Sequence, residues 1–219
     1  MAINTNALWY KVYKAVLDTL AKITWVKLRK FFTGKDYNLT AEDLDFIRKA
    51  LASNYYVIAT RRNTSLTTYI IALGSFITTG KFSHYDHVLM NLEGDNPNAD
   101  IDFYLMEATG SGVHWSSFMQ VFDCDSVALL KPKNITVEDW EGAVVAMKEQ
   151  LGKPYDDAID FSQTKRDSCV QMVNDSLMGM PDYNEKFPNL IADIKKYTRL
   201  TPQMYYDCPD FEVVFEARR

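Results

Sequence analysis

The chain has 219 residues, of which 47% are hydrophobic and 24% charged, and these values fit one compact domain with an appended segment. The formal net charge of −5 argues against nucleic acid as a partner, because surfaces that bind nucleic acid are rich in Lys and Arg. Residues 1–35 contain seven Lys or Arg residues and one acidic residue, Asp18. We therefore divide the chain into a basic helical arm, 1–35, and a catalytic domain, 36–219.

The arm is expected to contain an amphipathic helix over residues 7–32, because apolar residues recur there at three- to four-residue spacing and Lys and Arg residues lie opposite them. Such a helix packs on its own domain, lies on an anionic membrane surface or docks on a protein partner. The chain has no apolar run of about 18 residues that would span a membrane and no recognisable signal peptide. A cytoplasmic location is the default expectation, with a peripheral membrane or virion-associated location as the alternative.

The domain is expected to mix helices with short strands. Helical periodicity is seen over 40–51, 64–79, 136–151 and 168–177. Capping boxes predict two of the helix starts, at Thr40 with Asp43 and at Thr136 with Asp139, and Asp167 is the predicted N-cap of the last helix. The region around Gly179, Pro181 and Pro188 is expected to be a long loop.

Strands are predicted where β-branched and aromatic residues cluster between turn signals. These runs are 55–60, 87–92, 103–108, 126–130 and 211–215, with a further short element over 113–118. The last run alternates so that its apolar residues would face inward. This order of elements predicts the α+β class with a mostly antiparallel sheet.

Cys169 is the residue whose position suggests chemistry. It begins a predicted helix, and the unpaired N–H groups and partial positive charge of a helix N-terminus favour a thiolate, which is the nucleophilic form. A buried, unreactive core cysteine is the alternative. The other cysteines, Cys124 and Cys208, form no CxxC motif with it, so free thiols in a reducing compartment are expected. No cluster of ligands implies a metal or an organic cofactor.

A cysteine nucleophile needs a base, and the base needs an orienting partner. The chain has three histidines. His87 begins an apolar strand, His84 lies in the preceding loop, and His114 follows a glycine-rich turn; each could also be a surface or core histidine. Glu107 closes another apolar run, either as a strand end that reaches water or as the partner that fixes a histidine tautomer.

Several segments together resemble the permuted NlpC-type, papain-like amidases. The run from Ser83 through His87 to Leu92 is similar to their Ser-His-Val-Gly-Ile-Val strand, and Met106-Glu107-Ala108 with Gly112-Val113 is similar to their Ile-Glu-Ala…Gly-Val segment. Three later segments also match family motifs: Leu151-Gly152-Lys153-Pro154-Tyr155-Asp156, Ser168-Cys169-Val170-Gln171-Met172-Val173 and Leu200-Thr201-Pro202. The resemblance covers roughly residues 50–215, and it departs from the family at Gln171, where glutamate is common.

The resemblance implies a papain-like, circularly permuted NlpC-type fold in which the cysteine follows the histidine in the chain. It implies Cys169 as the nucleophile, His87 as the base, with His84 as the alternative base, and Glu107 as the orienting residue. Tyr155 would help to position an oxyanion or a substrate carbonyl.

The expected activity is that of a thiol hydrolase, an amidase, peptidase or acyl hydrolase that cleaves an amide or ester through an acyl-enzyme. The candidate substrates are peptidoglycan-type peptides and acylated lipids or amines. An acyltransferase with the same triad and a catalytically inert papain-like module in a larger assembly are the alternatives.

Overall fold

The computed structural model describes residues 38–62, 71–72, 75–76, 79–92, 104–155, 168–197 and 200–218. Within these ranges a six-stranded sheet has the order β4-β3-β2-β1-β5-β6, and every neighbouring pair is antiparallel. The strands are β1 (Val57–Arg61), β2 (His87–Met90), β3 (Tyr104–Thr109), β4 (Gly112–Ser117), β5 (Ser126–Pro132) and β6 (Phe211–Arg218). The predicted α+β class and the antiparallel sheet are confirmed.

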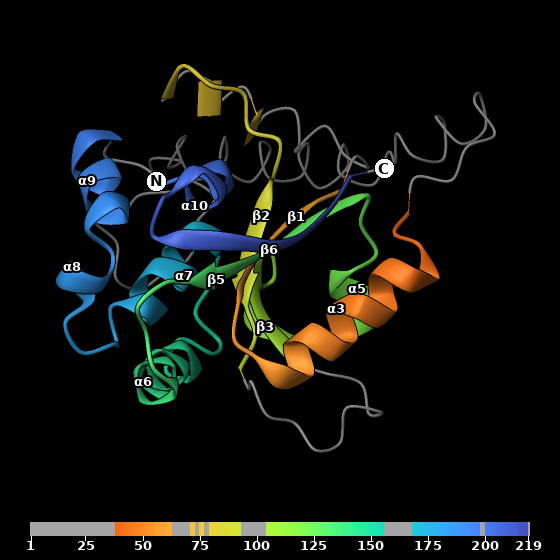
Figure 1. Ribbon diagram of the computed structural model, residues 1–219, viewed down its shortest axis with the longest axis horizontal. Helices are drawn as coiled ribbons and strands as arrows, with labels where there is room; N and C mark the ends of the chain where they lie inside the picture. Colours follow the sequence, from red (N-terminus) through yellow and green to blue (C-terminus); the bar gives the residue numbers. More distant parts are fainter. Residues whose placement is uncertain are drawn as a thin grey trace, which may run out of the picture.

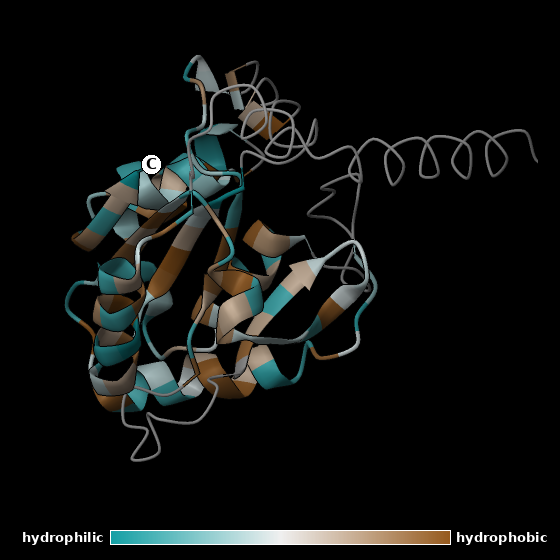
Figure 2. Cartoon of the chain, turned by 90° about the vertical axis from the view of Figure 1, so that its right-hand side faces the viewer, coloured by the Kyte–Doolittle hydropathy of each residue, from teal (hydrophilic) through white to brown (hydrophobic). Residues whose placement is uncertain are grey.

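Helices cover both sides of the sheet (Figure 1). One side carries α3 (Ala41–Ser53) and α5 (Phe118–Val121), and the other carries α6 (Val137–Lys148), α7 (Cys169–Leu177), α8 (Tyr183–Lys186), α9 (Pro188–Tyr197) and α10 (Pro202–Asp207). Hydrophobic residues concentrate in the central strands and on the inner faces of the helices (Figure 2). Burial of this apolar surface is the main favourable term that holds the helices on the sheet.

Both predicted capping boxes form. At α3 the Thr40 N–H donates to Asp43 Oδ2 at 2.8 Å, and the Asp43 N–H donates to Thr40 Oγ1 at 3.2 Å. Thr136 and Asp139 repeat the arrangement at α6 with the same two distances. Each box satisfies two N–H groups that a helix start leaves without an intrahelical acceptor. Helix α6 ends at Lys148, three residues before the predicted end.

The helix that carries Cys169 begins with a different cap from the predicted one. Ser168, not Asp167, is the N-cap of α7, and its Oγ accepts from the Gln171 N–H at 3.3 Å. Both residues are good N-caps, and the extended backbone at Ser168 places the boundary there. Cys169 is therefore the first residue of the helix.

The long loop predicted around residues 179–188 is wrong, because α8 and α9 form within and after it. Pro188, interpreted as a loop signal, is the first residue of α9, where proline has no N–H to leave unpaired. The cap of α9 comes from a residue that lies distant in sequence. Asp210 accepts from the Asn189 and Leu190 N–H groups, both at 2.9 Å, and from the Asn189 side chain at 2.6 Å.

The predicted inward-facing alternation in the last strand is also wrong. Phe211 is buried, but Val213 and Val214 are both about 40% exposed (42% and 39%). Strand β6 is an edge strand, and its register to β5 shifts between Leu129 and Leu130. An irregularity of this kind adds a residue to one strand and changes the side that following residues face.

The predicted arm lies outside the described residues, as do most of the helix predicted over 64–79 and Asp167. No described helix is long and apolar enough to cross a membrane.

Asp210→Ala is expected to lower the free energy of unfolding by about 2–3 kcal/mol, because the buried carboxylate accepts several hydrogen bonds at the start of α9. Urea denaturation measures the loss. Asp45→Ala is the control, since Asp45 is exposed and pairs with Lys49 at 2.7 Å, and it should cost about 0.5 kcal/mol or less. Equal losses in the two variants would contradict the capping role of Asp210.

Candidate active site

The first turn of α7 holds Cys169 against the sheet. Cys169 is 6% exposed, and α7 packs on β2 and β3. The Tyr205 hydroxyl of α10 donates to the Val170 carbonyl at 3.0 Å, which fixes this turn from the side. The first intrahelical bond runs from the Met172 N–H to the Ser168 carbonyl, so the Cys169 N–H precedes the helical ladder and is placed to donate to an anion.

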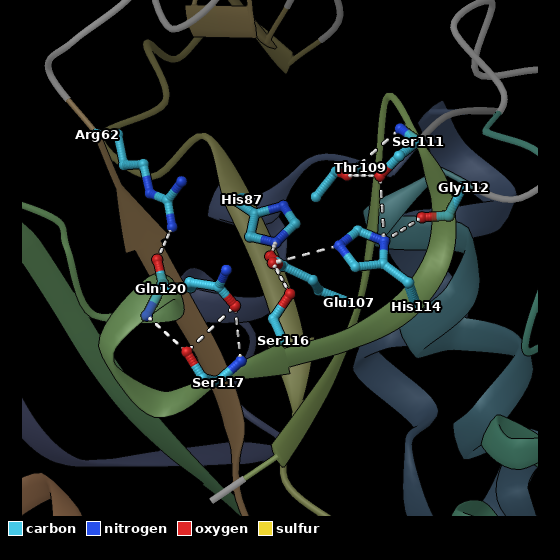
Figure 3. Close-up of polar contacts among 10 residues, drawn as sticks. All are labelled: Arg62, His87, Glu107, Thr109, Ser111, Gly112, His114, Ser116, Ser117 and Gln120. Atoms are coloured by element: carbon cyan, nitrogen blue, oxygen red, sulfur yellow. Dashed lines mark hydrogen bonds and ion pairs between the residues drawn. The ribbon is translucent and has the colours of Figure 1, made fainter. Parts of the chain in front are cut away.

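His87 is the first residue of β2 and pairs with Thr60 of β1. Its Nε2 lies 2.7 Å from Glu107 Oε2 (Figure 3). Because an ionised carboxylate can only accept, Nε2 carries the proton in the neutral ring and Nδ1 carries the lone pair. Burial lowers the pKa of His87, but hydrogen bonding and charge interactions with Cys169 and Glu107 outweigh it and raise the pKa well above the usual value. His87 is thus hydrogen-bonded to Glu107, and both Glu107 and Cys169 raise its pKa.

Glu107 lies in β3 and is 6% exposed. Its Oε1 accepts from Ser116 Oγ at 2.5 Å, while Oε2 accepts from His87. Burial alone would raise the pKa of this carboxyl, but the His87 interactions, the Ser116 hydrogen bond and the charge of Arg62 lower it to about 2. Glu107 is therefore an ionised, buried carboxylate with a donor on each oxygen.

His84, the alternative base, has other partners. Its Nδ1 lies 3.1 Å from Arg61 Nη1, and its backbone N–H donates to Gln203 Oε1 at 2.8 Å. Burial and the charges of Arg218 and Arg61 lower the pKa of His84 to about 4. Since a guanidinium can only donate, His84 Nδ1 acts as an acceptor. Among the described residues, the contacts of His84 are with Arg61, Gln203 and the Tyr85 ring, and none is with Glu107.

The turn that carries Tyr155 is tied to the start of β4. The Val113 N–H donates to the Lys153 carbonyl, and the Gly152 N–H donates to the Val113 carbonyl, both at 2.9 Å. Gly112 has φ +102°, and a Cβ there would meet the Lys153 carbonyl oxygen at 2.6 Å, so this close approach requires glycine. Tyr155 lies half-buried against the core at the end of the turn. Its role toward an oxyanion remains a prediction.

The β3–β4 hairpin adds two residues that sequence reasoning missed in this role, Ser116 and His114. His114 is the register partner of Glu107, and its Nε2 lies 3.9 Å from Glu107 Oε1. A regular hairpin closed by the turn at Gly110–Gly112 would have predicted this pairing, and the period of two along a strand places Ser116 on the same face as His114. Figure 3 shows these side chains converging on Glu107.

A cavity of about 670 Å³ opens beside this cluster. Glu107, His114 and Ser116 line one part of it, and the residue after β1, the start of α3, and α5 with the residues that follow it line the rest. Arg62 reaches across it and donates to the Gln120 carbonyl. His87 and Cys169 are not among its lining residues, so the cavity adjoins the site at Glu107 and the β3–β4 hairpin.

The three cysteines are free thiols, and all are buried. Burial raises the pKa of both Cys124 and Cys208 to about 12, which makes both poor nucleophiles near neutral pH. Within the described ranges no group of three or more His, Cys, Asp or Glu side chains is arranged to hold a metal ion.

No protein-family model and no curated protein matches the chain. A solved structure, described as metalloprotein yiiX from Escherichia coli O157:H7, DUF1105, is similar in fold. Its identity to this chain is 17% and its TM-score 0.54, over 77% of this chain and 99% of that chain. At this identity the likeness concerns the fold. The metal in the description of yiiX belongs to that protein, and the described residues here do not form a matching ligand cluster.

The opposite surroundings of His84 and His87 predict opposite effects of pH on stability. The pKa of His84 is lower in the folded chain than in the unfolded chain, so its contribution to stability is lost as the pH falls from about 6.5 to about 4. His84→Gln should therefore gain stability relative to the wild type over this range in urea denaturation.

The stability of His87→Gln relative to the wild type should depend on pH in the opposite sense. Because the folded-state pKa of His87 is raised, its contribution is fully present below about pH 6.5 and is lost at higher pH as the pH approaches the folded-state pKa. The penalty of this variant should be larger at pH 5.5 than at pH 9. The same sign of pH dependence in both variants would contradict the assigned surroundings.

Proposed function

We propose that this chain is a cysteine hydrolase of the permuted NlpC-type, papain-like kind, which cleaves an amide or ester through an acyl-enzyme on Cys169. The observation that carries the proposal is the convergence of Cys169, His87 and Glu107. They come from α7, β2 and β3, which pack together; His87 Nε2 lies 2.7 Å from Glu107 Oε2, and Cys169 contributes to raising the pKa of His87. A nucleophile beside a base that is oriented by a third group is the arrangement that covalent acyl transfer requires.

The proposed reaction starts with the proton of the Cys169 thiol already held on Nδ1 of His87, because the pKa of His87 is raised and Nε2 is engaged by Glu107. The thiolate attacks the substrate carbonyl carbon, and the negative charge passes to the carbonyl oxygen. The Cys169 N–H at the start of α7 is placed to donate to this oxyanion, with Tyr155 as the predicted second contact. The tetrahedral intermediate collapses to a thioester as His87 gives its proton to the departing amine or alcohol.

Water then completes the cycle. His87 accepts a proton from water as the oxygen attacks the thioester, and the C–S bond breaks to release the carboxylic acid. The proton returns to the Cys169 sulfur. Glu107 keeps its negative charge throughout and stabilises the imidazolium that forms in each half of the cycle. An acyltransferase would follow the same steps with an amine or alcohol in place of water.

The candidate substrates are peptidoglycan-type peptide amides and acylated lipids or amines. The segment 7–32, proposed as a surface for membranes or protein partners, lies outside the described residues. Liposome co-sedimentation of the full chain and of a chain without residues 1–32 tests the membrane proposal, which fails if both bind equally or if neither binds.

Iodoacetamide labelling, located by mass spectrometry, tests the dyad. Cys169 is expected to label at least about tenfold faster at pH 7 than Cys124 or Cys208, whose pKa values are raised by burial. His87→Ala should reduce the rate at Cys169 by about tenfold or more, and His84→Ala is the matched control with little effect. If Cys169 labels no faster than the other two thiols, the hydrolase proposal fails and an inert papain-like module becomes the better reading.

Trapping the acyl-enzyme tests the covalent step. Brief incubation with an activated acyl ester should add one acyl mass to Cys169, and Cys169→Ala should not be acylated there. In Glu107→Gln the adduct should form about 10²–10⁴-fold more slowly. Release of free acid identifies a hydrolase, and transfer to an added amine or alcohol identifies an acyltransferase. No adduct with any ester or amide tested would count against both.

A further inference from the structure

We infer that Ser116 is a positioning residue that holds the Glu107 carboxylate on His87, an inference that rests on the proposed function. Ser116 lies in β4, one strand beyond the one that carries Glu107, and it is 3% exposed. Its role would be to fix the carboxylate so that His87 keeps one tautomer and one orientation toward Cys169.

The two oxygens of Glu107 have separate donors. Oε2 accepts from His87 Nε2 at 2.7 Å, and Oε1 accepts from Ser116 Oγ at 2.5 Å. A carboxylate held at one oxygen only can rotate about its terminal torsion, which has a broad energy profile. Two donors from different strands therefore define the plane of the carboxylate as well as its position.

A second side chain, His114, lies near the same oxygen of Glu107 that accepts from Ser116. His114 Nε2 lies 3.9 Å from Glu107 Oε1. The Nδ1 of His114 lies 2.9 Å from the Gly112 carbonyl, which can only accept, so Nδ1 carries the proton in the neutral ring and Nε2 has none to donate. A neutral His114 therefore cannot replace Ser116 as the donor to Oε1.

The cavity next to Glu107 makes other donors to this carboxylate available. Glu107, Ser116 and His114 all line this space of about 670 Å³. Without the Ser116 hydroxyl, water in the cavity or a protonated His114 would be the available donor to Oε1. Either would draw the carboxylate away from His87 and weaken the bond that fixes the His87 tautomer. The hydroxyl thus acts on the nucleophile through two intermediate residues.

The test measures the His87 titration directly by two-dimensional NMR of its imidazole Cε1–H group in the full chain. In Ser116→Ala the pKa of His87 is expected to fall by about one unit, a tenfold change in its protonation equilibrium. Ser116→Thr and Ser116→Val form a matched pair of nearly equal shape. The first keeps the hydroxyl and should titrate as the wild type does, and the second should resemble Ser116→Ala.

Ser117→Ala is the structural control. Ser117 is the N-cap of α5 and accepts from the Gln120 N–H at 3.4 Å, so its loss should lower stability in urea without moving the His87 titration. An unchanged His87 pKa in folded Ser116→Ala or Ser116→Val overturns the inference. If Ser116→Ala does not fold, the Thr and Val pair decides.

The alkylation rate of Cys169 separates this inference from the proposed function. A reactive Cys169 in the wild type with no effect of Ser116→Val on the His87 titration overturns the inference and leaves the hydrolase proposal standing. A His87 titration that moves in Ser116→Val while Cys169 is unreactive in every variant supports the positioning contact and overturns the hydrolase proposal. If Cys169 is reactive in the wild type and the His87 titration moves in Ser116→Val, the pH midpoint of Cys169 alkylation should be higher in Ser116→Val than in the wild type.

Discussion

The hydrogen bond between His87 and Glu107 is the interaction on which the described site depends. Removing a carboxylate from water is costly unless it is paired and hydrogen-bonded, and Glu107 meets this condition through donors from β2 and β4. The pairing requires β2 and β3 to be neighbours and β3 to form a hairpin with β4, as the sheet order provides. The antiparallel sheet thus positions Glu107 and also supplies the two donors that offset the cost of burying its charge.

His84 and His87 show how strongly the local environment determines what one residue type can do. They lie three positions apart, yet arginine faces one ring and a carboxylate faces the other. The pKa of His84 is lowered and that of His87 raised, so near neutral pH the His84 ring is a neutral acceptor and the His87 ring holds a proton on both nitrogens. The change from loop to strand at His87 turns the second ring toward β3 and α7, and this switch separates a candidate base from a structural histidine.

Much of the sheet could be predicted from the sequence, because runs of β-branched and aromatic residues are local signals. The starts of α3 and α6 could be predicted for the same reason, since each has a capping box. Helix α9 could not, since its cap, Asp210, comes from beyond the next helix. The exposure of Val213 likewise depends on the register shift between β5 and β6, where Val214 is the extra residue. Cys169 and His87 could be singled out because each begins an element, and Glu107 because it is a charged residue in an otherwise apolar strand run, although it lies inside β3 and not at its end. Ser116 could not, because an ordinary strand serine gains its role only when the hairpin register sets it against Glu107.

The order of elements along the chain has a consequence for synthesis on the ribosome. Strands β1 to β4, which include His87, Glu107 and Ser116, precede α7 in the chain, so they leave the ribosome before α7 does, at about 5–20 residues per second. The base and its carboxylate can therefore pair before the nucleophile has been translated. The thiol then arrives last, on a helix that docks against a pocket already formed, so a nascent chain carries no assembled dyad until most of the domain exists.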